Sequence, residues 1–293
     1  MDTATVGVLR DVFFWDMLAL ALGLVVYAYL RSKSGPGWYQ DGRVNVGAFD
    51  AGDGIVAMML IFIMSWSLIN AAQGAHPAPA QAPAVQKTDA SEANNIATLI
   101  VSDFVFVCMG GALIMYLWLF RGLNPIELFG LRRVRPGTAI GLAIIWVTGA
   151  IIAMMVLQNF LEHFIPDDSP QQENVVAFRK GSFGFKVLMA GSAVIVAPLV
   201  EELLFRGFIY GVTKRFTERR FATLFSAVLF AVAHNNVLSL FPLMLLAIIL
   251  AVAYEMSGSL TVPMSMHAIF NAWNLTLMWL EKQPSASSAK IFW

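Results

Sequence analysis

Two glutamates and an arginine lie inside an apolar stretch, VAPLVEELLFRGFIYG, at residues 196–211. A charged residue at the centre of a membrane-spanning helix costs roughly 2.5 to 3.5 kcal/mol, so three unpaired charges would cost about 8 to 10 kcal/mol. Glu202 and Arg206 are four residues apart, on one helical face, and are predicted to form an ion pair. Glu201 points about 100° away from Glu202 around the helix and needs another partner. A structural ion pair accounts for Glu202 and Arg206, whereas the additional carboxylate of Glu201 favours a functional site.

Candidate partners for Glu201 occur in two later apolar stretches. FAVAHNN places His234 four residues after Phe230, and MSMHAIFNAWN places His267 four residues before Asn271. Side chains four residues apart project from one face of a helix. An isolated histidine in a membrane helix is as often a packing or helix-bridging residue as a ligand. A carboxylate, two imidazoles and an amide on three apolar stretches together favour a shared polar site.

Such a set of side chains can hydrolyse an acyl bond. A carboxylate in a pocket of low dielectric constant is a competent general base for water, which is the role predicted for Glu201. Neutral imidazoles can share this water, bind a metal or donate to a developing oxyanion, and Asn271 adds an amide donor. No serine or cysteine nucleophile is indicated, because the one cysteine, Cys108, is far from these segments in sequence and has no marker of activation.

A metal site is a second interpretation of the same residues. The HExxH signature is absent from the chain, which excludes a zinc protease of the soluble type. Glu201, His234 and His267 would still supply the two imidazoles and one carboxylate of a catalytic zinc centre. A divalent metal such as Zn is therefore an open cofactor prediction.

The elements that must hold these residues are membrane helices. Of the 293 residues, 58% are hydrophobic and 13% charged, and the mean hydropathy is +0.68, far above that of soluble domains. Apolar runs long enough for about 30 Å of hydrocarbon lie near residues 12–30, 53–72, 97–120, 138–160, 184–211, 219–235, 238–256 and 260–281. The sixth run is the weakest, because it is short and ends in HNN. Since the runs are too long for barrel strands, the predicted fold is all-α, a polytopic transmembrane bundle of about eight spans.

Basic residues predict the orientation of this bundle. They follow the first, third and fifth spans: Arg31, Lys33, Arg43, Arg121, Arg132, Arg133, Arg135, Lys214, Arg215, Arg219 and Arg220. Fewer follow the second and fourth spans, so the positive-inside rule places both termini outside. The net charge of +0 gives no footprint of nucleic-acid binding. We expect a multi-pass protein of the cell inner membrane. Its predicted partner is the lipid bilayer, and no nucleic-acid partner is expected.

Composition divides the chain into four parts. Residues 1–95 hold two spans and a Pro/Ala-rich external loop at residues 75–95, which cannot bury a core. Residues 96–182 hold the middle spans and a connecting loop, residues 183–283 a catalytic core, and residues 284–293 a tail.

Two acidic residues outside the predicted site have simpler interpretations. Asp103 is placed near the end of the third span, and its carboxylate is expected to reach the membrane interface. Glu255 precedes MSGSL, a turn signal between the last two spans, and is expected to be a charge at a loop end.

Three motifs carry a family resemblance. EExxxR at 201–206, FxxxH at 230–234 and HxxxN at 267–271, in this order on membrane spans, resemble the CAAX prenyl protease and bacteriocin-processing (CPBP, or Abi) intramembrane proteases. Each motif is short, but the ordered set is specific. The resemblance implies an endopeptidase that cuts membrane-associated or prenylated peptides near their C-terminus, or that processes or confers immunity to peptide bacteriocins.

The resemblance also implies a role for each matching residue. Glu201 corresponds to the base that activates water, and His234 assists it. His267 and Asn271 correspond to the groups that stabilise the oxyanion, and the Glu202–Arg206 pair supports them. The implied partner is a peptide or lipid-modified peptide substrate, and the implied chemistry is either glutamate-dependent or metal-dependent.

Two other classes of function stay open. Glu, His and Arg within spans also describe a proton relay, so a proton-coupled membrane carrier is one alternative, although no inverted repeat is visible. A non-catalytic membrane scaffold or immunity protein is the other. Glu201→Gln separates them, because a protease loses function with its expression intact, a scaffold tolerates the change, and a carrier shows ion-gradient dependence.

Overall fold

The computed structural model describes residues 42–74, 88–161, 173–234 and 239–280. Within these ranges every regular element is a helix, which confirms the predicted all-α class. The predicted first span at 12–30, most of the Pro/Ala-rich loop and the tail at 284–293 lie outside the described residues.

The helices match the other seven predicted spans closely. The α-helices are α2 (Ala51–Gly74), α3 (Thr88–Met115), α4 (Pro125–Leu128), α5 (Pro136–Leu161), α6 (Glu173–Lys180), α7 (Phe183–Gly191), α8 (Ala197–Glu202), α9 (Tyr210–Phe216), α10 (Arg219–Ala233), α11 (Leu240–Ser257) and α12 (Thr261–Leu280). The π-helical segments are η2 (Tyr116–Phe120), η3 (Ser192–Val196) and η4 (Leu203–Ile209). The segments from α7 to α9 join into one helix, Phe183–Phe216, of 34 residues.

Four of these stretches are long and apolar enough to cross a membrane: Asn94–Phe120, Pro136–Leu161, Phe183–Phe216 and Leu240–Ser257. The sixth predicted span is shorter than expected, because α10 has 15 residues, or about 22 Å of helix, against about 30 Å of hydrocarbon. The chain is thus an integral membrane protein, and its number of crossings stays a prediction.

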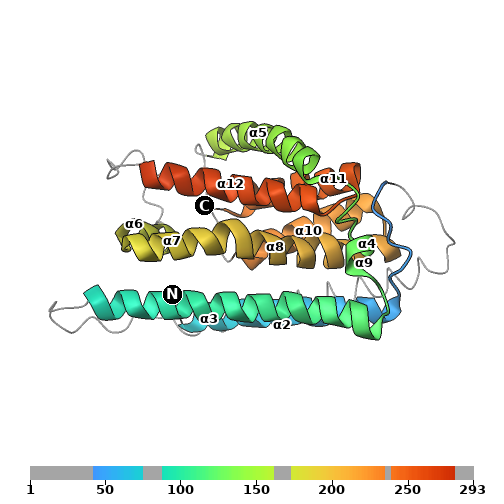
Figure 1. Cartoon of the computed structure of the whole chain (residues 1–293), viewed down its shortest axis with the longest axis horizontal. Helices are drawn as coiled ribbons and strands as arrows, with labels where there is room; N and C mark the ends of the chain where they lie inside the picture. Colours follow the sequence, from blue (N-terminus) through green and yellow to red (C-terminus); the bar gives the residue numbers. More distant parts are fainter. Residues whose placement is uncertain (1–41, 75–87, 162–172, 235–238, 281–293) are drawn as a thin grey trace.

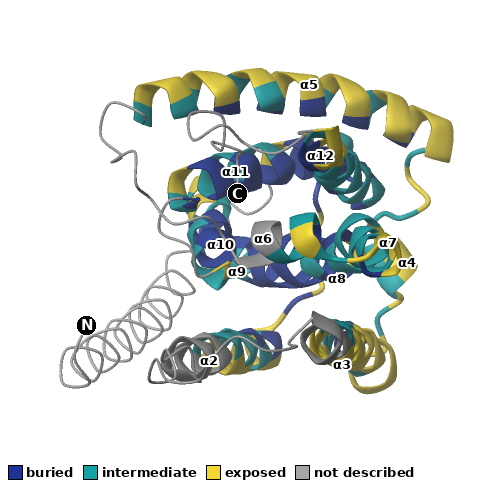
Figure 2. Cartoon of the chain, turned by 90° about the vertical axis from the view of Figure 1, so that its left-hand side faces the viewer, coloured by how far each residue is buried: buried dark blue, intermediate teal, exposed yellow. Residues whose placement is uncertain are grey.

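The helices lie in layers along one long axis (Figure 1). The helix from α7 to α9 and α10 form the middle, with α2 and α3 on one side and α11 and α12 on the other (Figure 2). α5 covers the outside of α11 and α12 (Figure 2). Buried residues gather on the middle helices, whereas large apolar side chains on α3 and α5, such as Phe104 and Phe160, are exposed. An apolar exterior of this kind suits lipid rather than water.

α5 packs through a seam of small and medium-sized side chains. Its buried residues are Ala139, Ala143, Val147, Ala150 and Met154. They pack with buried residues of α11 and α12 that include Leu250 and Met266. Small side chains at this spacing allow membrane helices to approach closely, since van der Waals contact rather than water exclusion drives their association.

The loops predicted to share one side of the membrane meet at one end of the bundle. The Leu260 amide donates to the Phe129 carbonyl at 3.0 Å, and the Arg133 side chain donates to the Arg43 carbonyl at 2.9 Å. Gly130 and Gly258 both have positive φ, and a Cβ on Gly130 would meet the Gly258 carbonyl oxygen at 2.2 Å. The close approach of these loops therefore requires glycine at position 130.

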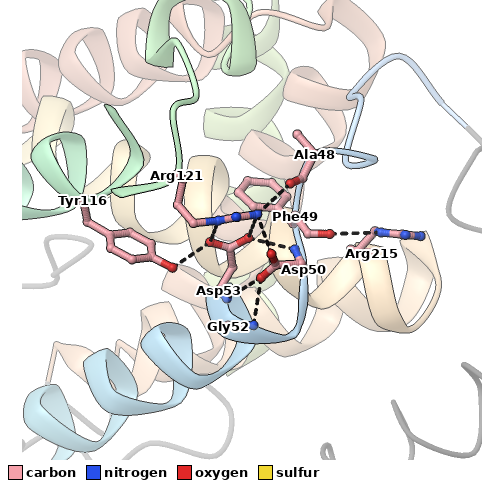
Figure 3. Close-up of polar contacts among 8 residues, drawn as sticks. All are labelled: Ala48, Phe49, Asp50, Gly52, Asp53, Tyr116, Arg121 and Arg215. Carbon is pink, nitrogen blue, oxygen red and sulfur yellow. Dashed lines mark hydrogen bonds and ion pairs between the residues drawn. The ribbon is translucent and has the colours of Figure 1, made fainter. Parts of the chain in front are cut away.

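Acidic residues at the start of α2 fasten this end to η2 and to the residue that follows it (Figure 3). The buried Asp53 carboxylate accepts hydrogen bonds from the Tyr116 hydroxyl and from Arg121 Nε, both at 2.9 Å. Arg121 also pairs with Asp50 at 2.8 Å, and Arg215 Nε donates to the Phe49 carbonyl at 3.2 Å. The hydrogen bond to Asp53 raises the pKa of the Arg121 guanidinium above its usual value. Arg121 therefore stays charged, and the contact is lost only in strongly basic solution.

Glu255 is not the loop-end charge that its sequence context indicates. It is 6% exposed and accepts hydrogen bonds from the Tyr210 hydroxyl at 2.6 Å and from Lys214 Nζ at 2.5 Å. Lys214, which is fully buried, also donates to the Val44 carbonyl at 3.1 Å. The expectation was wrong because α9 and the backbone at Val44 pack against the end of α11 and enclose the carboxylate.

Candidate active site

The helix that carries the two glutamates is π-helical on both sides of them. Glu201 and Glu202 end α8, between η3 and η4. In η3 the Ala197 amide donates to the Ser192 carbonyl, five residues back. The next donor in that register would face the Ala193 carbonyl, but it is Pro198, which has no N–H. π-Helical turns of this kind occur often at functional sites.

Asn271 of α12 satisfies the carbonyl that Pro198 leaves open. Its side-chain Nδ2 donates to the Ala193 carbonyl at 2.7 Å. A buried carbonyl without a donor is costly, particularly in lipid, so this contact joins α12 to η3. It uses one of the two N–H groups of the Asn271 amide, and the other stays available to a bound molecule.

Glu202 is the centre of the polar cluster. Its side chain is fully buried, and Oε1 accepts hydrogen bonds from Arg206 Nη1 at 2.7 Å and from His267 Nδ1 at 2.9 Å. The predicted Glu202–Arg206 pair is therefore present, and it extends to the histidine of α12. Because a carboxylate oxygen accepts, the hydrogen on the His267 ring is assigned to Nδ1.

His267 presents its other nitrogen to Glu201. Nε2 lies 3.7 Å from Glu201 Oε2, which is too long for a direct hydrogen bond. A neutral ring with its hydrogen on Nδ1 has a free lone pair on Nε2, so two acceptors face each other across this gap. One small donor, such as a water molecule, fits the chemistry of such a pair.

Three polar atoms of the cluster have no hydrogen-bond partner among the described residues: Glu201 Oε2, Glu202 Oε2 and Arg206 Nη2. Leaving a buried polar group unsatisfied costs about 1 to 3 kcal/mol, and more for a charged group. Three such atoms on neighbouring turns form a site that is complete only when a polar molecule occupies it.

Phe230 holds the aromatic side of the cluster. Its ring centroid lies 4.3 Å from the Arg206 guanidinium carbon, within reach of a cation–π interaction. The same ring meets the rings of His267 and His234, with centroids 5.8 and 4.6 Å away. The motif at residues 230–234 predicts no role for Phe230, and in the structure its ring places α10 against η4 and α12.

His234 is placed differently from the other predicted site residues. It is exposed, at the end of α10, and its Nδ1 lies 2.8 Å from the Phe230 carbonyl oxygen. The ring contact with Phe230 links it to the cluster, but no polar contact joins it to the glutamates. Asn235 and Asn236, which follow it, lie outside the described residues.

The predicted metal ligands are brought together only in part. Glu201 and His267 face each other, whereas the Nδ1 of His234 is occupied by its own helix. In the part of the chain that the structure describes, no three His, Cys, Asp or Glu side chains form a group that could hold a metal ion. A metal held by Glu201, His234 and His267 stays a prediction, and the chemistry below is derived from the side chains themselves.

Asp103 lies within α3 and has a hydrogen-bond partner inside the bundle. It is nine residues beyond Asn94, where the membrane-length stretch begins, or about 13 Å along the helix. Its Oδ1 accepts a hydrogen bond from the Ser192 hydroxyl at 2.6 Å. Its expected reach to the membrane interface stays a prediction, and the structure adds a donor within the bundle, the serine at the start of η3. Asp103 thus fastens α3 beside the carbonyl that Asn271 occupies.

Residues 183–273, which contain this cluster, match the family model described as type II CAAX prenyl endopeptidase Rce1-like. This stretch, less than half of the chain, is similar to that family model. The family resemblance drawn from the three motifs is therefore confirmed over these residues.

The chain is also similar to a curated protein. The Bacillus subtilis (strain 168) protein named "Putative membrane peptidase YdiL" is 27% identical over 146 residues, which are 49% of this chain and 59% of that protein. The chain thus spans less than two thirds of the length of this relative. No solved structure matches the chain significantly.

Proposed function

We propose that this chain is an intramembrane endopeptidase that hydrolyses a peptide bond in a membrane-associated substrate. One observation carries the proposal: Glu201 Oε2 and His267 Nε2 lie 3.7 Å apart, and Glu201 Oε2 has no hydrogen-bond partner among the described residues. A water molecule between them can donate one hydrogen to each. The similarity to the Rce1-like family model and the printed name of the relative support a peptidase.

In the proposed reaction, Glu201 takes a proton from this water as its oxygen attacks the carbonyl carbon of the scissile bond. The carbonyl π electrons move to oxygen, and a tetrahedral oxyanion forms. Collapse of this intermediate breaks the C–N bond, and the proton on Glu201 passes to the leaving amine. The products are one carboxylic acid and one amine.

The other residues position and stabilise this reaction. Glu202 accepts from Nδ1 of His267 and so keeps Nε2 directed at the water, as carboxylates commonly do for functional histidines. Arg206 neutralises Glu202 and contacts Phe230. The second N–H of Asn271 is the candidate donor to the oxyanion, and His234, at the exposed end of α10, is the candidate to assist the water or the leaving group.

The substrate class follows from the family rather than from the geometry. The family description names a CAAX prenyl endopeptidase, so we propose a prenylated or otherwise membrane-bound peptide, with a bacteriocin-like peptide as the alternative. A site among membrane helices suits a substrate that partitions into lipid.

The test is cleavage of a quenched fluorescent peptide, prenylated and unprenylated, by detergent-purified protein. Glu201→Gln is compared with Glu127→Gln, which makes the same change at an exposed glutamate on α4. Loss of a general base lowers rates by roughly 10² to 10⁴, so Glu201→Gln is expected to abolish most cleavage while Glu127→Gln retains it.

Two further results decide the alternatives. Wild-type activity that survives a chelator supports the glutamate-dependent reaction, and loss with recovery on adding Zn²⁺ supports the metal-dependent one. Full cleavage by folded Glu201→Gln would falsify the assignment of the base, and an unaffected cellular function in that variant would favour a scaffold.

A further inference from the structure

A cavity separate from the candidate active site opens at the basic end of the bundle, where α4 and α9 lie (Figure 1). It has a volume of about 450 Å³ and is lined by the segment before α2, the chain around α4 and the end of α11. No residue of the candidate active site lines it. Its polar side chains are Asn45, Asn124, Glu127, Arg132, Arg133 and Tyr254.

Of these six side chains, only that of Tyr254 is buried, with 1% of it exposed. Its ring packs against that of Tyr210, with the centroids 6.4 Å apart. The Tyr210 hydroxyl donates to Glu255 at 2.6 Å, whereas the Tyr254 hydroxyl has no hydrogen-bond partner among the described residues. Buried polar groups are nearly always hydrogen-bonded in proteins. The Tyr254 hydroxyl is therefore a donor that the cavity presents to a bound molecule.

The two asparagines also present donors to the cavity. Asn45 and Asn124 each accept, through Oδ1, from the backbone amide two residues further along the chain, at 3.0 Å. Because these contacts use the oxygen of each side chain, the Nδ2 groups are left to donate. A hydroxyl and two amides thus favour a ligand with several acceptor atoms.

The charged residues of the lining leave a net positive charge. Two arginines, Arg132 and Arg133, line the cavity against one glutamate, Glu127, which gives +1. Arg132 forms no ion pair or hydrogen bond with any described residue, and Glu127 pairs with neither arginine. Arg133 Nη1 donates to the Arg43 carbonyl at 2.9 Å, but a carbonyl does not neutralise the guanidinium. The ligand that these groups favour is therefore an anion.

The structure assigns to this cavity a binding site for a phosphate group, with Tyr254, the two arginines and the two asparagines as its donors. A phosphate group carries at least three acceptor oxygens, and arginine side chains match its geometry through two parallel hydrogen bonds. Residues 124–133 lie between two membrane-length stretches, Asn94–Phe120 and Pro136–Leu161. Both a soluble phosphate ester and the headgroup of a phospholipid can therefore reach the cavity. This inference does not depend on the proposed peptidase activity.

The experiment is isothermal titration calorimetry of the detergent-purified full chain with sn-glycerol 3-phosphate, at a temperature where every variant is folded. Tyr254→Phe removes a hydroxyl without a partner, and Tyr210→Phe makes the same change at a hydroxyl that is bonded to Glu255. A hydrogen bond to a charged group contributes about tenfold or more to affinity, so Tyr254→Phe is expected to weaken binding by that factor. Its melting temperature should not fall. Tyr210→Phe should lower the melting temperature and keep the affinity.

A second pair of variants tests the charge. Arg132→Gln removes a charge that lines the cavity, whereas Arg135→Gln removes one from an exposed residue outside it. We expect about tenfold weaker binding for Arg132→Gln and unchanged binding for Arg135→Gln. Unchanged binding by Tyr254→Phe overturns the inference, as does equal weakening by the two arginine variants.

Phosphatidic acid in mixed micelles with phosphatidylcholine separates the two sources of the phosphate group. Saturable binding of sn-glycerol 3-phosphate assigns the site to a soluble phosphate ester. Preferential retention of phosphatidic acid that Tyr254→Phe abolishes, without binding of sn-glycerol 3-phosphate, assigns it to a lipid headgroup. Failure of wild type to bind either ligand overturns the inference.

Discussion

Glu201 and Glu202 are neighbours in the chain, but their side chains have opposite surroundings. Glu202 is fully buried and bridges Arg206 and His267, whereas Glu201 is 15% exposed and one of its oxygens has no hydrogen-bond partner among the described residues. One carboxylate therefore stabilises the bundle, and the other is available to react. Such a division lets the bundle tolerate an unpaired charge in the membrane at the one position where chemistry needs it.

The same substitution at both positions tests this division. Glu202→Gln removes the negative charge beside buried Arg206, and breaking a buried ion pair from one side costs about 3 to 5 kcal/mol. We expect a clear fall in the melting temperature of detergent-purified protein for Glu202→Gln, and little change for Glu201→Gln. Both variants should lose cleavage, since Glu202 also orients His267. Equal melting shifts for the two variants would contradict the separate roles.

At the scale of elements, the candidate site depends on a defect in one helix. Pro198 interrupts the backbone hydrogen bonding of η3 and α8, and Asn271 crosses from α12 to the Ala193 carbonyl, which has lost its backbone donor. The Ser192 hydroxyl, one residue earlier, binds Asp103 of α3. Three helices thus meet at two consecutive residues of η3, a little more than two turns before Glu201.

Pro198 and Asn271 should therefore be coupled energetically. Asn271→Ala leaves the Ala193 carbonyl without a donor, which we expect to destabilise the protein by about 1 to 3 kcal/mol. Adding Pro198→Ala restores a backbone N–H, so the double variant should regain part of the lost melting temperature.

Activity separates the two roles of Asn271. If its second N–H also serves the oxyanion, cleavage by the double variant stays low while stability recovers. If the changes in stability of Asn271→Ala and Pro198→Ala simply add up to the change in the double variant, Pro198 and Asn271 do not share the Ala193 carbonyl.

The sequence predicts these elements well and their contacts less well. Apolar runs locate seven helices to within a few residues, except that α3 begins well before its predicted start at residue 97, because the membrane requires long helices with internally paired backbones. Glu202 and Arg206 are four residues apart, and this spacing predicts their ion pair because it places both side chains on one face of a helix. The roles of Ser192, Ala193 and Phe230 depend on how three helices rotate against one another, and periodicity within one helix carries no information about that rotation. Pro198 was the available signal, since a proline inside an apolar run marks an unsatisfied carbonyl.

Across the whole molecule, the basic end is held together by buried ion pairs as well as by loops. Lys214 and Glu255 join α9 to α11, and Lys214 also reaches the Val44 carbonyl before α2. The sequence did not predict this junction, because Glu255 stands next to a turn signal and a charge there is usually solvated. Its burial follows from loops that close over the end of α11.

Removing one member of this junction should cost more than removing both. Lys214→Met leaves Glu255 buried without its cation, which we expect to cost about 3 to 5 kcal/mol. Lys214→Met with Glu255→Gln removes both charges and should recover most of that loss in a denaturation experiment. A double variant less stable than Lys214→Met would contradict the proposed pairing.

The two ends of the bundle differ in charge, and this difference predicts the orientation in the membrane. The end with α4 and α9 carries Arg43, Arg121, Arg132, Arg133, Arg135, Lys214, Arg215, Arg219 and Arg220, whereas the described residues near the other end carry Arg179, Lys180 and Lys186 (Figure 1). The positive-inside rule then places the α4 end in the cytoplasm.

Single cysteines can measure this orientation, because Cys108 is the one native cysteine and Cys108→Ser removes it. Lys180→Cys and Arg132→Cys then report the two ends from exposed positions on α6 and just after α4. With a membrane-impermeant maleimide, we expect Lys180→Cys to react in intact cells and Arg132→Cys to react only after permeabilisation. The reversed pattern would contradict the orientation and leave the fold intact. Reaction of both in intact cells would contradict the placement of α4 and α6 at opposite membrane faces.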